Sequence, residues 1–153
     1  MTTPEERVKE LGLSIPEVPK PVAVYVPAVR TGQYIYTSGQ LPMRDGTLMT
    51  TGKVGGEVSV EEGTACAQRC ALNAIAAVKS VIGDLENVVR VVKVVVFVAS
   101  TPDFTGQPGV ANGASELIGT AFGDAGEHAR SAVGVAVLPL DAPVEVELVV
   151  EVR

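Results

Sequence analysis

The sequence predicts an α+β fold in which helices cover one face of a mixed β-sheet. Three observations predict it. The 153 residues fit a single domain, residues 1–153. Apolar side chains recur three and four positions apart over about residues 60–82, which indicates a helix with one buried stripe. Valine-rich segments with strand character lie between the helical ones, in the order helix, two strands, helix, strand, helix, two strands.

The chain opens with a predicted short helix and an extended connector. Thr3 and Glu6 have capping-box spacing and Pro4 suits the first helical turn, so a helix is expected from Thr3 to about Gly12. Three prolines between positions 16 and 21 then favour an extended chain. Residues 1–20 are therefore interpreted as a helical extension followed by a connector.

A β-hairpin and a long excursion are expected next. Residues 22–29 and 33–38 have strand character and flank a turn at residues 30–33. Residues 43–57 are rich in glycine, which predicts an irregular, exposed loop.

The centre of the chain predicts a helix, a strand and a second helix. Ser59 and Glu62 form another capping box, and the helix should run to about Ile82. Residues 88–99 form an almost continuous apolar run, typical of a strand covered on both sides. A further helix is expected at about residues 107–122. The buried stripe of the first helix is predicted to include Ala67, Cys70, Ala71, Ala74, Ile75 and Val78.

Two closing strands, residues 131–137 and 144–152, are expected to form a hairpin that pairs Val137 with Val144. In that register Arg130 lies opposite Glu151, roughly 20 Å along the sheet from Glu145. If helices cover only one face, the other face needs a partner, and a second copy of the chain is the simplest one. Arg130 of one copy could then meet Glu145 of the next.

Charge and hydropathy narrow the possible partners. The net charge of -6 argues against a general nucleic-acid binder, and the basic residues form no run suited to a membrane surface. The N-terminus lacks a signal-type apolar run, and no stretch of about 20 apolar residues exists. A cytoplasmic protein with neither nucleic-acid nor membrane partners is expected.

Metal chemistry is not expected from the sequence. Cys66 and Cys70 are four apart on a predicted helix, where they read as small core residues, because a disulfide at this spacing is strained. A zinc site needs more ligands than these two and His128, the single histidine.

Arg130 is the foremost candidate for binding. It precedes a strand of small residues, and a guanidinium offers a planar, permanently charged fork for a carboxylate. The alternative for Arg130 is an interface ion pair with Glu151 or Glu127. His128 is read as a hydrogen-bonded residue more readily than as a base. Ser38 lacks a nucleophile's partners, so it is read as a hydrogen-bonding turn residue.

Six short motifs, in order and at compatible spacing, resemble the RidA family, also called YjgF, of reactive-intermediate (enamine/imine) deaminases, over about residues 20–153. They are Tyr25 near the start, the Ser38-Gly39-Gln40-Leu41-Pro42 turn, residues 91–104 ending in Asp103-Phe104, Asn112, Ala129-Arg130-Ser131, and Leu138-Pro139 through Glu145 to Glu147.

The resemblance implies a chorismate-mutase-like α+β fold with two main helices on one face, assembled as a homotrimer with clefts between subunits. It implies hydrolysis of 2-aminoacrylate-type enamines and imines to 2-keto acids and ammonia, without metal or organic cofactor. Arg130 would clamp the substrate carboxylate and Glu145 would position or activate water. The further substrate-binding positions would be Tyr25, Ser38, Gly39, Asn112 and Ala132.

The chain departs from the usual family pattern in places. Ala132 stands where many active members have cysteine, and Val22-Ala23-Val24 precedes Tyr25 without the usual glycine and proline. Residues 1–20 and 43–57 are additions, typical of a longer branch of the family. Glu145 could alternatively be a solvated strand carboxylate, and Tyr25 a core residue. The alternative function is a trimer that binds small carboxylates such as 2-keto acids without turnover; a ribonuclease is disfavoured by the acidic charge.

Overall fold

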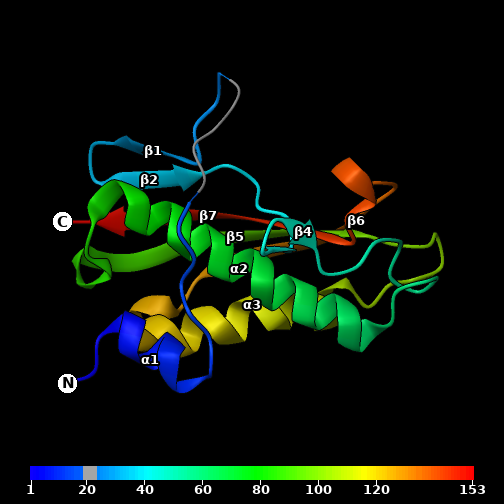
Figure 1. Cartoon of the computed structure of the whole chain (residues 1–153), viewed down its shortest axis with the longest axis horizontal. Coiled ribbons are helices and arrows are strands. Elements are labelled where there is room, and N and C mark those ends of the chain that lie inside the picture. The colour runs from blue at the N-terminus through cyan, green and yellow to red at the C-terminus, as the bar shows by residue number, and fades with distance from the viewer. Residues whose placement is uncertain (19–23) are drawn as a thin grey trace.

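The protein is a mixed α+β structure with one main sheet and helices packed against it (Figure 1). The computed structural model describes residues 1–18 and 24–153. The main sheet has the strand order β1-β2-β7-β5-β6, and β3 and β4 form a separate two-stranded ribbon. The elements are α1 (Pro4–Glu10), β1 (Ala28–Thr31), β2 (Tyr34–Thr37), β3 (Met43–Arg44), β4 (Thr47–Leu48), α2 (Val60–Ile82), β5 (Val88–Ala99), α3 (Gln107–Phe122), β6 (Ala129–Val135) and β7 (Val144–Val152).

The predicted helices are confirmed, with their caps. The Thr3 and Ser59 side chains accept hydrogen bonds from the backbone N–H groups of Glu6 and Glu62, and those glutamates reach back to the cap residues. Helix α1 ends at Glu10, slightly before the expected position. Among residues 1–18 and 24–153, no helix combines the length and apolar character needed to cross a bilayer.

The predicted position of the first strand, residues 22–29, is wrong. Strand β1 begins at Ala28 and runs to Thr31, whereas residues 24–27 form no strand. Pro27 has no N–H to donate to a ladder, so pairing with β2 begins one residue later, at Ala28 opposite Thr37. The expected hairpin itself is present. Residues 22 and 23 of the predicted strand, and Pro19 and Pro21 of the predicted connector, lie outside the described residues.

The glycine-rich excursion is more ordered than expected. Strands β3 and β4 pair in antiparallel fashion around Asp45-Gly46, whose positive φ angles of 53° and 83° match a tight hairpin turn. Val54 is fully buried and its backbone N–H donates to the Ala99 carbonyl oxygen. The prediction of a wholly irregular, exposed loop overlooked the Asp-Gly turn signal.

The prediction of a hairpin between the last two strands is also wrong. Strand β6 pairs in parallel with β5, and β7 pairs in antiparallel fashion with β5 on its other side. The reason is topological: α3 is a crossover helix that returns the chain parallel to β5, and parallel neighbours need such a connection. Arg130 is therefore level with Val94, and Glu151 is level with Arg90 and Tyr34.

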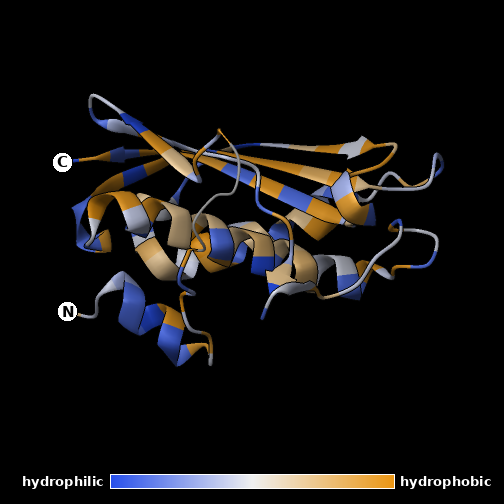
Figure 2. Cartoon of the chain, turned by 45° about the horizontal axis from the view of Figure 1, so that its top comes forward, coloured by the Kyte–Doolittle hydropathy of each residue, from blue (hydrophilic) through white to orange (hydrophobic). Residues whose placement is uncertain are grey.

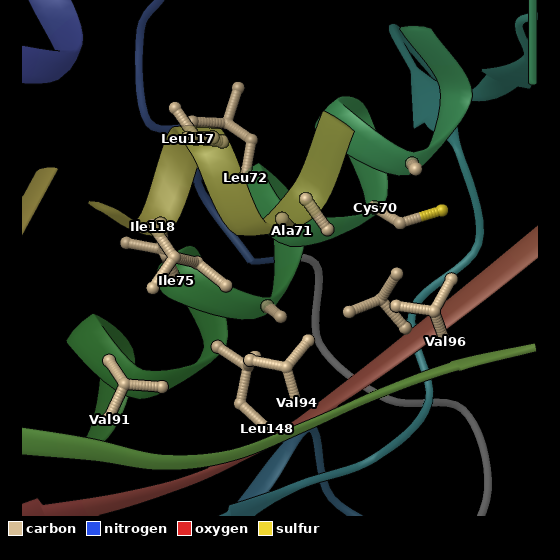
Figure 3. Close-up of a cluster of buried hydrophobic side chains, with 14 of the residues drawn as sticks. Cys70, Ala71, Leu72, Ile75, Val91, Val94, Val96, Leu117, Ile118 and Leu148 are labelled. Carbon is tan, nitrogen blue, oxygen red and sulfur yellow. The ribbon is translucent and has the colours of Figure 1, made fainter. Parts of the chain in front are cut away.

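The core lies between the helices and one face of the sheet (Figure 3). The predicted stripe of α2 is buried, with Ala67, Cys70, Ala71 and Ala74 at 0% exposure. The buried valines of β5 and the even-numbered residues of β7 belong to the same core cluster as this stripe. Alternation of hydrophilic and hydrophobic residues along the strands is visible in Figure 2, as a sheet covered on one face requires.

In the described part of the chain, no α-helix packs on the other face of the sheet, which mixes apolar with acidic groups. Tyr34, Tyr36 and Val133 are among its exposed side chains. Phe97 of β5 and Glu145 of β7 are register partners on this face and are only partly buried. We call it the open face. It places polar groups of β7 beside apolar groups of neighbouring strands.

Candidate functional site

Arg130 lies near the start of β6, an edge strand of the sheet. It shares a face with its buried partner Val94, so its side chain starts on the helix side, toward α3. Ala132 lies two residues further on the same face and packs against the core. The chain thus brings a half-buried guanidinium to the sheet edge beside α3.

Neutral polar groups hold the Arg130 guanidinium. Its Nη1 donates to Asn112 Oδ1 at 2.8 Å and to Ser115 Oγ at 3.2 Å. Ser115 Oγ lies 2.9 Å from His128 Nε2, and His128 Nδ1 contacts the Gly126 carbonyl oxygen. Among the described residues of the single chain, Arg130 forms no ion pair. A cation held by neutral groups at a sheet edge is suited to binding an anion.

Glu145 stands on the open face, against the turn that follows β2. A Cβ atom added at Gly39 would collide with Glu145 Oε1, so the glycine leaves the space that this carboxylate occupies. Desolvation raises the pKa of Glu145, and the negative charge of Glu147 raises it further. A carboxyl group of raised pKa can exchange protons closer to neutral pH than an ordinary glutamate.

Ser38 ties the segment before β1 to the end of β2. Its hydroxyl donates to the Val26 carbonyl oxygen at 2.6 Å, and its N–H donates to that of Pro27 at 2.8 Å. This matches a hydrogen-bonding turn residue. Tyr25, next to this segment, is 65% exposed, which excludes the core-packing interpretation for its side chain in the single chain.

A groove of about 1610 Å³ joins the second group of predicted residues. Among the described residues it extends along α2 past Arg69 and Asn73. Its sequence-predicted lining residues are Tyr25, Ser38, Gly39 and Glu145. The structure therefore brings these four together in one region, and Arg130, Asn112 and Ala132 together in another.

The two regions lie apart within one chain. Arg130 is level with Leu148 across β5, three residues from Glu145 along β7. Three residues at about 3.3 Å and two strand spacings of about 4.8 Å separate their Cα atoms by roughly 14 Å. The odd register difference also puts their side chains on opposite faces. One small molecule cannot touch both in the same subunit.

The cysteines take no part in either region. Cys66 and Cys70 are at most 1% exposed and are free thiols. Burial raises the pKa of Cys66 to about 11 and that of Cys70 well above its ordinary value, with smaller contributions from nearby anionic groups. Both thiols are therefore poor nucleophiles, as a core position predicts. Across residues 1–18 and 24–153 there is no cluster of three or more His, Cys, Asp or Glu that could hold a metal ion.

Ser115 is the member of the Arg130 region that the sequence interpretation missed. A signal was available, because Asn112 and Ser115 are three apart and share a face of α3. His128 was expected to be hydrogen-bonded, and the contacts with Ser115 and Gly126 agree. The link between His128 and Arg130 through Ser115 depends on how β6 lies beside α3, which residue spacing does not specify.

The fold and its side chains define a small mixed α+β protein with two candidate polar regions on opposite faces of one sheet. The family model described as Endoribonuclease L-PSP matches residues 16–152. Protein TCP17 of Trypanosoma cruzi is 47% identical over 147 residues, covering 95% of this chain and 92% of that protein. A 2-iminobutanoate/2-iminopropanoate deaminase of Dermatophagoides farinae is 33% identical over 142 residues, covering 92% of this chain and 95% of that one.

Solved structures agree with these sequence matches. The Agrobacterium tumefaciens protein Atu1372, of unknown function, superimposes with a TM-score of 0.93 at 46% identity, covering 98% of this chain and 92% of that one. The chain belongs to the Endoribonuclease L-PSP family, which is the YjgF/RidA family.

Proposed function

We propose that the protein hydrolyses small enamines and imines of the 2-aminoacrylate type to 2-keto acids and ammonia. The observation that carries the proposal is the Arg130 guanidinium, held by Asn112 and Ser115 and left without a carboxylate partner among the described residues. The relative from Dermatophagoides farinae, named as an iminobutanoate/iminopropanoate deaminase, supports the same reaction class.

The site is proposed to lie between subunits of a homotrimer. Arg130 and Glu145 are too far apart, and on opposite faces, to serve one ligand in one chain. The open face, with exposed Tyr34, Tyr36 and Val133, offers the surface for another copy. Arg130, Asn112 and Ala132 of one subunit then face Tyr25, Ser38, Gly39 and Glu145 of the next.

Each residue has a defined part in the proposed reaction. Arg130 binds the substrate carboxylate. An enamine first gains a proton on its terminal carbon and loses one from its nitrogen to solvent, and so becomes the imine. Glu145 accepts a proton from water as the new C–O bond forms at the imine carbon, and it returns that proton to nitrogen. The hydroxyl proton of the resulting carbinolamine then passes by way of Glu145 to nitrogen as the C–N bond breaks, so that the C=O bond forms and ammonia and the 2-keto acid are released.

Proximity and proton transfer suffice for this chemistry. An imine carbon is already electrophilic, so holding the carboxylate and placing a water are the principal tasks. The raised pKa of Glu145 keeps its proton exchangeable nearer neutral pH. No metal or organic cofactor enters the proposed mechanism, and we place the reaction in the cytoplasm, in a protein of one domain.

A coupled assay tests the reaction directly. A dehydratase supplies 2-aminoacrylate, and keto-acid release is followed with and without the protein. The wild-type protein is expected to accelerate release and Arg130→Ala to abolish the acceleration. A wild-type protein without effect, or an Arg130→Ala variant as active as wild type, contradicts the proposal.

Mixing two inactive variants tests the shared site. Arg130→Ala and Glu145→Gln subunits are unfolded together and refolded as mixed oligomers. With random assembly and sites shared between subunits, about a quarter of the sites contain both native residues, so about a quarter of wild-type activity returns. No recovery, from oligomers shown to be mixed, contradicts an inter-subunit site.

A second candidate function is a trimer that binds small carboxylates without turnover. It is favoured by the same Arg130 geometry, which needs no catalytic group to hold a 2-keto acid. Calorimetric titration with 2-ketobutyrate separates the two functions. Tight binding together with zero deamination supports the binding function.

A further inference from the structure

A chain of hydrogen bonds leads from Arg130 through Ser115 and His128 to Gly126. The donor and acceptor roles at its two ends follow from the chemistry of the groups there. A guanidinium can only donate, so Asn112 Oδ1 and Ser115 Oγ accept from Nη1. The Gly126 carbonyl oxygen can only accept, so His128 Nδ1 carries the proton that faces it. The hydroxyl of Ser115 and the Nε2 atom of His128 lie between these two ends, 2.9 Å apart.

One arrangement satisfies every group in this chain. A neutral imidazole protonated on Nδ1 leaves Nε2 as an acceptor for the Ser115 hydroxyl hydrogen. The Ser115 oxygen is then free to accept from Arg130. A proton on Nε2 would instead turn that atom into a donor and place a second cation no more than two hydrogen bonds from the guanidinium, which opposes it electrostatically.

We propose that Ser115 and His128 are positioning residues that fix the orientation of the Arg130 guanidinium through a neutral, Nδ1-protonated imidazole. His128 holds the hydroxyl of Ser115, and Ser115 with Asn112 occupies the two N–H hydrogens of Nη1. Neither Ser115 nor His128 touches the substrate in this scheme.

This arrangement leaves one edge of the Arg130 guanidinium available to bind a ligand. With Nη1 engaged by the protein, Nε and Nη2 are the remaining donors, and their N–H groups lie parallel on one edge of the guanidinium. A carboxylate fits this edge with two hydrogen bonds. This part of the inference rests on the proposed function, since it assumes that a 2-keto or 2-imino acid binds Arg130. The tautomer of His128 does not depend on it.

Nuclear magnetic resonance of the imidazole nitrogens tests the tautomer. The chain has one histidine, so protein carrying an affinity tag without histidine gives a single imidazole spectrum. In ¹⁵N-labelled wild-type protein at about pH 8.5, above the usual titration range of imidazoles, His128 is expected to be protonated on Nδ1. An Nε2-protonated ring, or one averaging between both tautomers, overturns the proposal.

Ligand binding tests the positioning effect. Ser115→Ala is expected to weaken 2-ketobutyrate binding about tenfold, the scale of one lost hydrogen bond to a charged group, and to raise KM with little change in kcat. Ser115→Thr, which keeps the hydroxyl, should restore most of the affinity. The matched control is Ser80→Ala, a helical serine whose hydroxyl donates to the Ala77 carbonyl oxygen, and it should bind like wild type.

The outcomes separate this inference from the proposed function. Wild-type affinity in a folded Ser115→Ala variant overturns the positioning role even when deamination is present. A wild-type protein that shows the Nδ1 tautomer and binds 2-ketobutyrate, yet does not accelerate deamination, contradicts the enzyme and leaves the positioning role supported.

Discussion

The two candidate regions, around Arg130 and around Glu145, hold groups of opposite charge in different environments. Arg130 is held by neutral hydrogen-bonding side chains on the helix side of an edge strand. Glu145 stands on the open face of a central strand, accepts no hydrogen bond from the described residues, and has a pKa raised by desolvation and by Glu147. The first region holds the permanently charged Arg130 guanidinium in one orientation. The second region holds the Glu145 carboxyl group, which can gain or lose a proton.

This difference suggests a division of labour. A rigidly held guanidinium suits binding, because its orientation is set before the ligand arrives. A partly desolvated carboxyl group suits proton transfer, because its protonated and ionised forms are closer in free energy. Substitutions in the two regions are therefore expected to affect different quantities.

The largest effect is expected from Glu145→Gln, which removes the proton acceptor. Turnover should fall by about 1000-fold, within the usual range for lost acid–base catalysis, while 2-ketobutyrate binding changes little. Coupled deamination kinetics and calorimetry on the same preparation measure both. Weakened binding with normal turnover would reverse the roles assigned to the two regions.

The Glu145→Gln substitution is also expected to change how the free energy of unfolding depends on pH. Because its pKa is raised in the folded state, Glu145 binds a proton more tightly there than in the unfolded chain. Wild-type stability therefore falls as pH rises from the ordinary glutamate pKa through the raised one, and stays lower above it. Glu145→Gln lacks this loss and should be at least as stable as wild type at neutral pH, as measured by urea unfolding at several pH values.

Arg130→Lys keeps the charge and removes the fork. A loss of about 100-fold in kcat/KM is expected, because a lysine cannot reproduce the paired hydrogen bonds to a carboxylate and to Asn112 and Ser115. The matched control is Arg30→Lys, since among the described residues the Arg30 side chain donates to the backbone oxygens of Gly32 and Arg153. An equal loss in both variants would show that the effect is not specific to Arg130.

Gly39→Ala tests the space beside Glu145. An added Cβ collides with the Glu145 carboxylate, so the carboxylate is displaced and turnover is expected to fall about tenfold. Gly119→Ala serves as the control, because its added Cβ meets nothing within 4 Å. The control should leave turnover unchanged and should stabilise α3 by up to about 1 kcal/mol, measured by thermal unfolding.

The smallest effect is expected from Glu147→Gln. Removal of this negative charge lowers the pKa of Glu145, so the acid limb of the pH–rate profile should move to lower pH. Glu151→Gln, further along the same strand, should leave the limb in place, because Glu151 is not among the causes of the raised pKa. A limb unmoved by Glu147→Gln would indicate that another group controls it.

Local structure and the β1–β2 hairpin could be predicted from this sequence, whereas the pairing of the last two strands could not. The capping boxes at Thr3 and Ser59 and the valine run of β5 place their elements within a few residues. The predicted pairing of β6 was wrong because strands adjacent in sequence usually form hairpins. Here β6 follows a crossover helix and pairs in parallel with β5. The parallel pairing of β6 places Arg130 beside α3, where its side chain donates a hydrogen bond to Ser115.

The structure groups the candidate site residues into two regions, and the sequence interpretation anticipated this grouping only in part. Arg130 and Asn112 do meet, and Tyr25, Ser38, Gly39 and Glu145 do line one groove. The sequence interpretation anticipated that Arg130 and Glu145 are apart, but with a wrong register and a separation that is too long. Short motifs specify which residues are present, and only the sheet specifies which of them share a face.

By itself the sequence determined the helices, the buried stripe of α2 and the alternation along β7, because these follow from local caps and from periods of 3.6 and 2 residues. Only the tertiary structure decided that β5 lies between β6 and β7, that Arg130 donates to Ser115, which in turn contacts His128, and that Glu145 fills the space left by Gly39. The physical reason is that these contacts join residues distant along the chain, and their register is set by how the whole sheet buries one face.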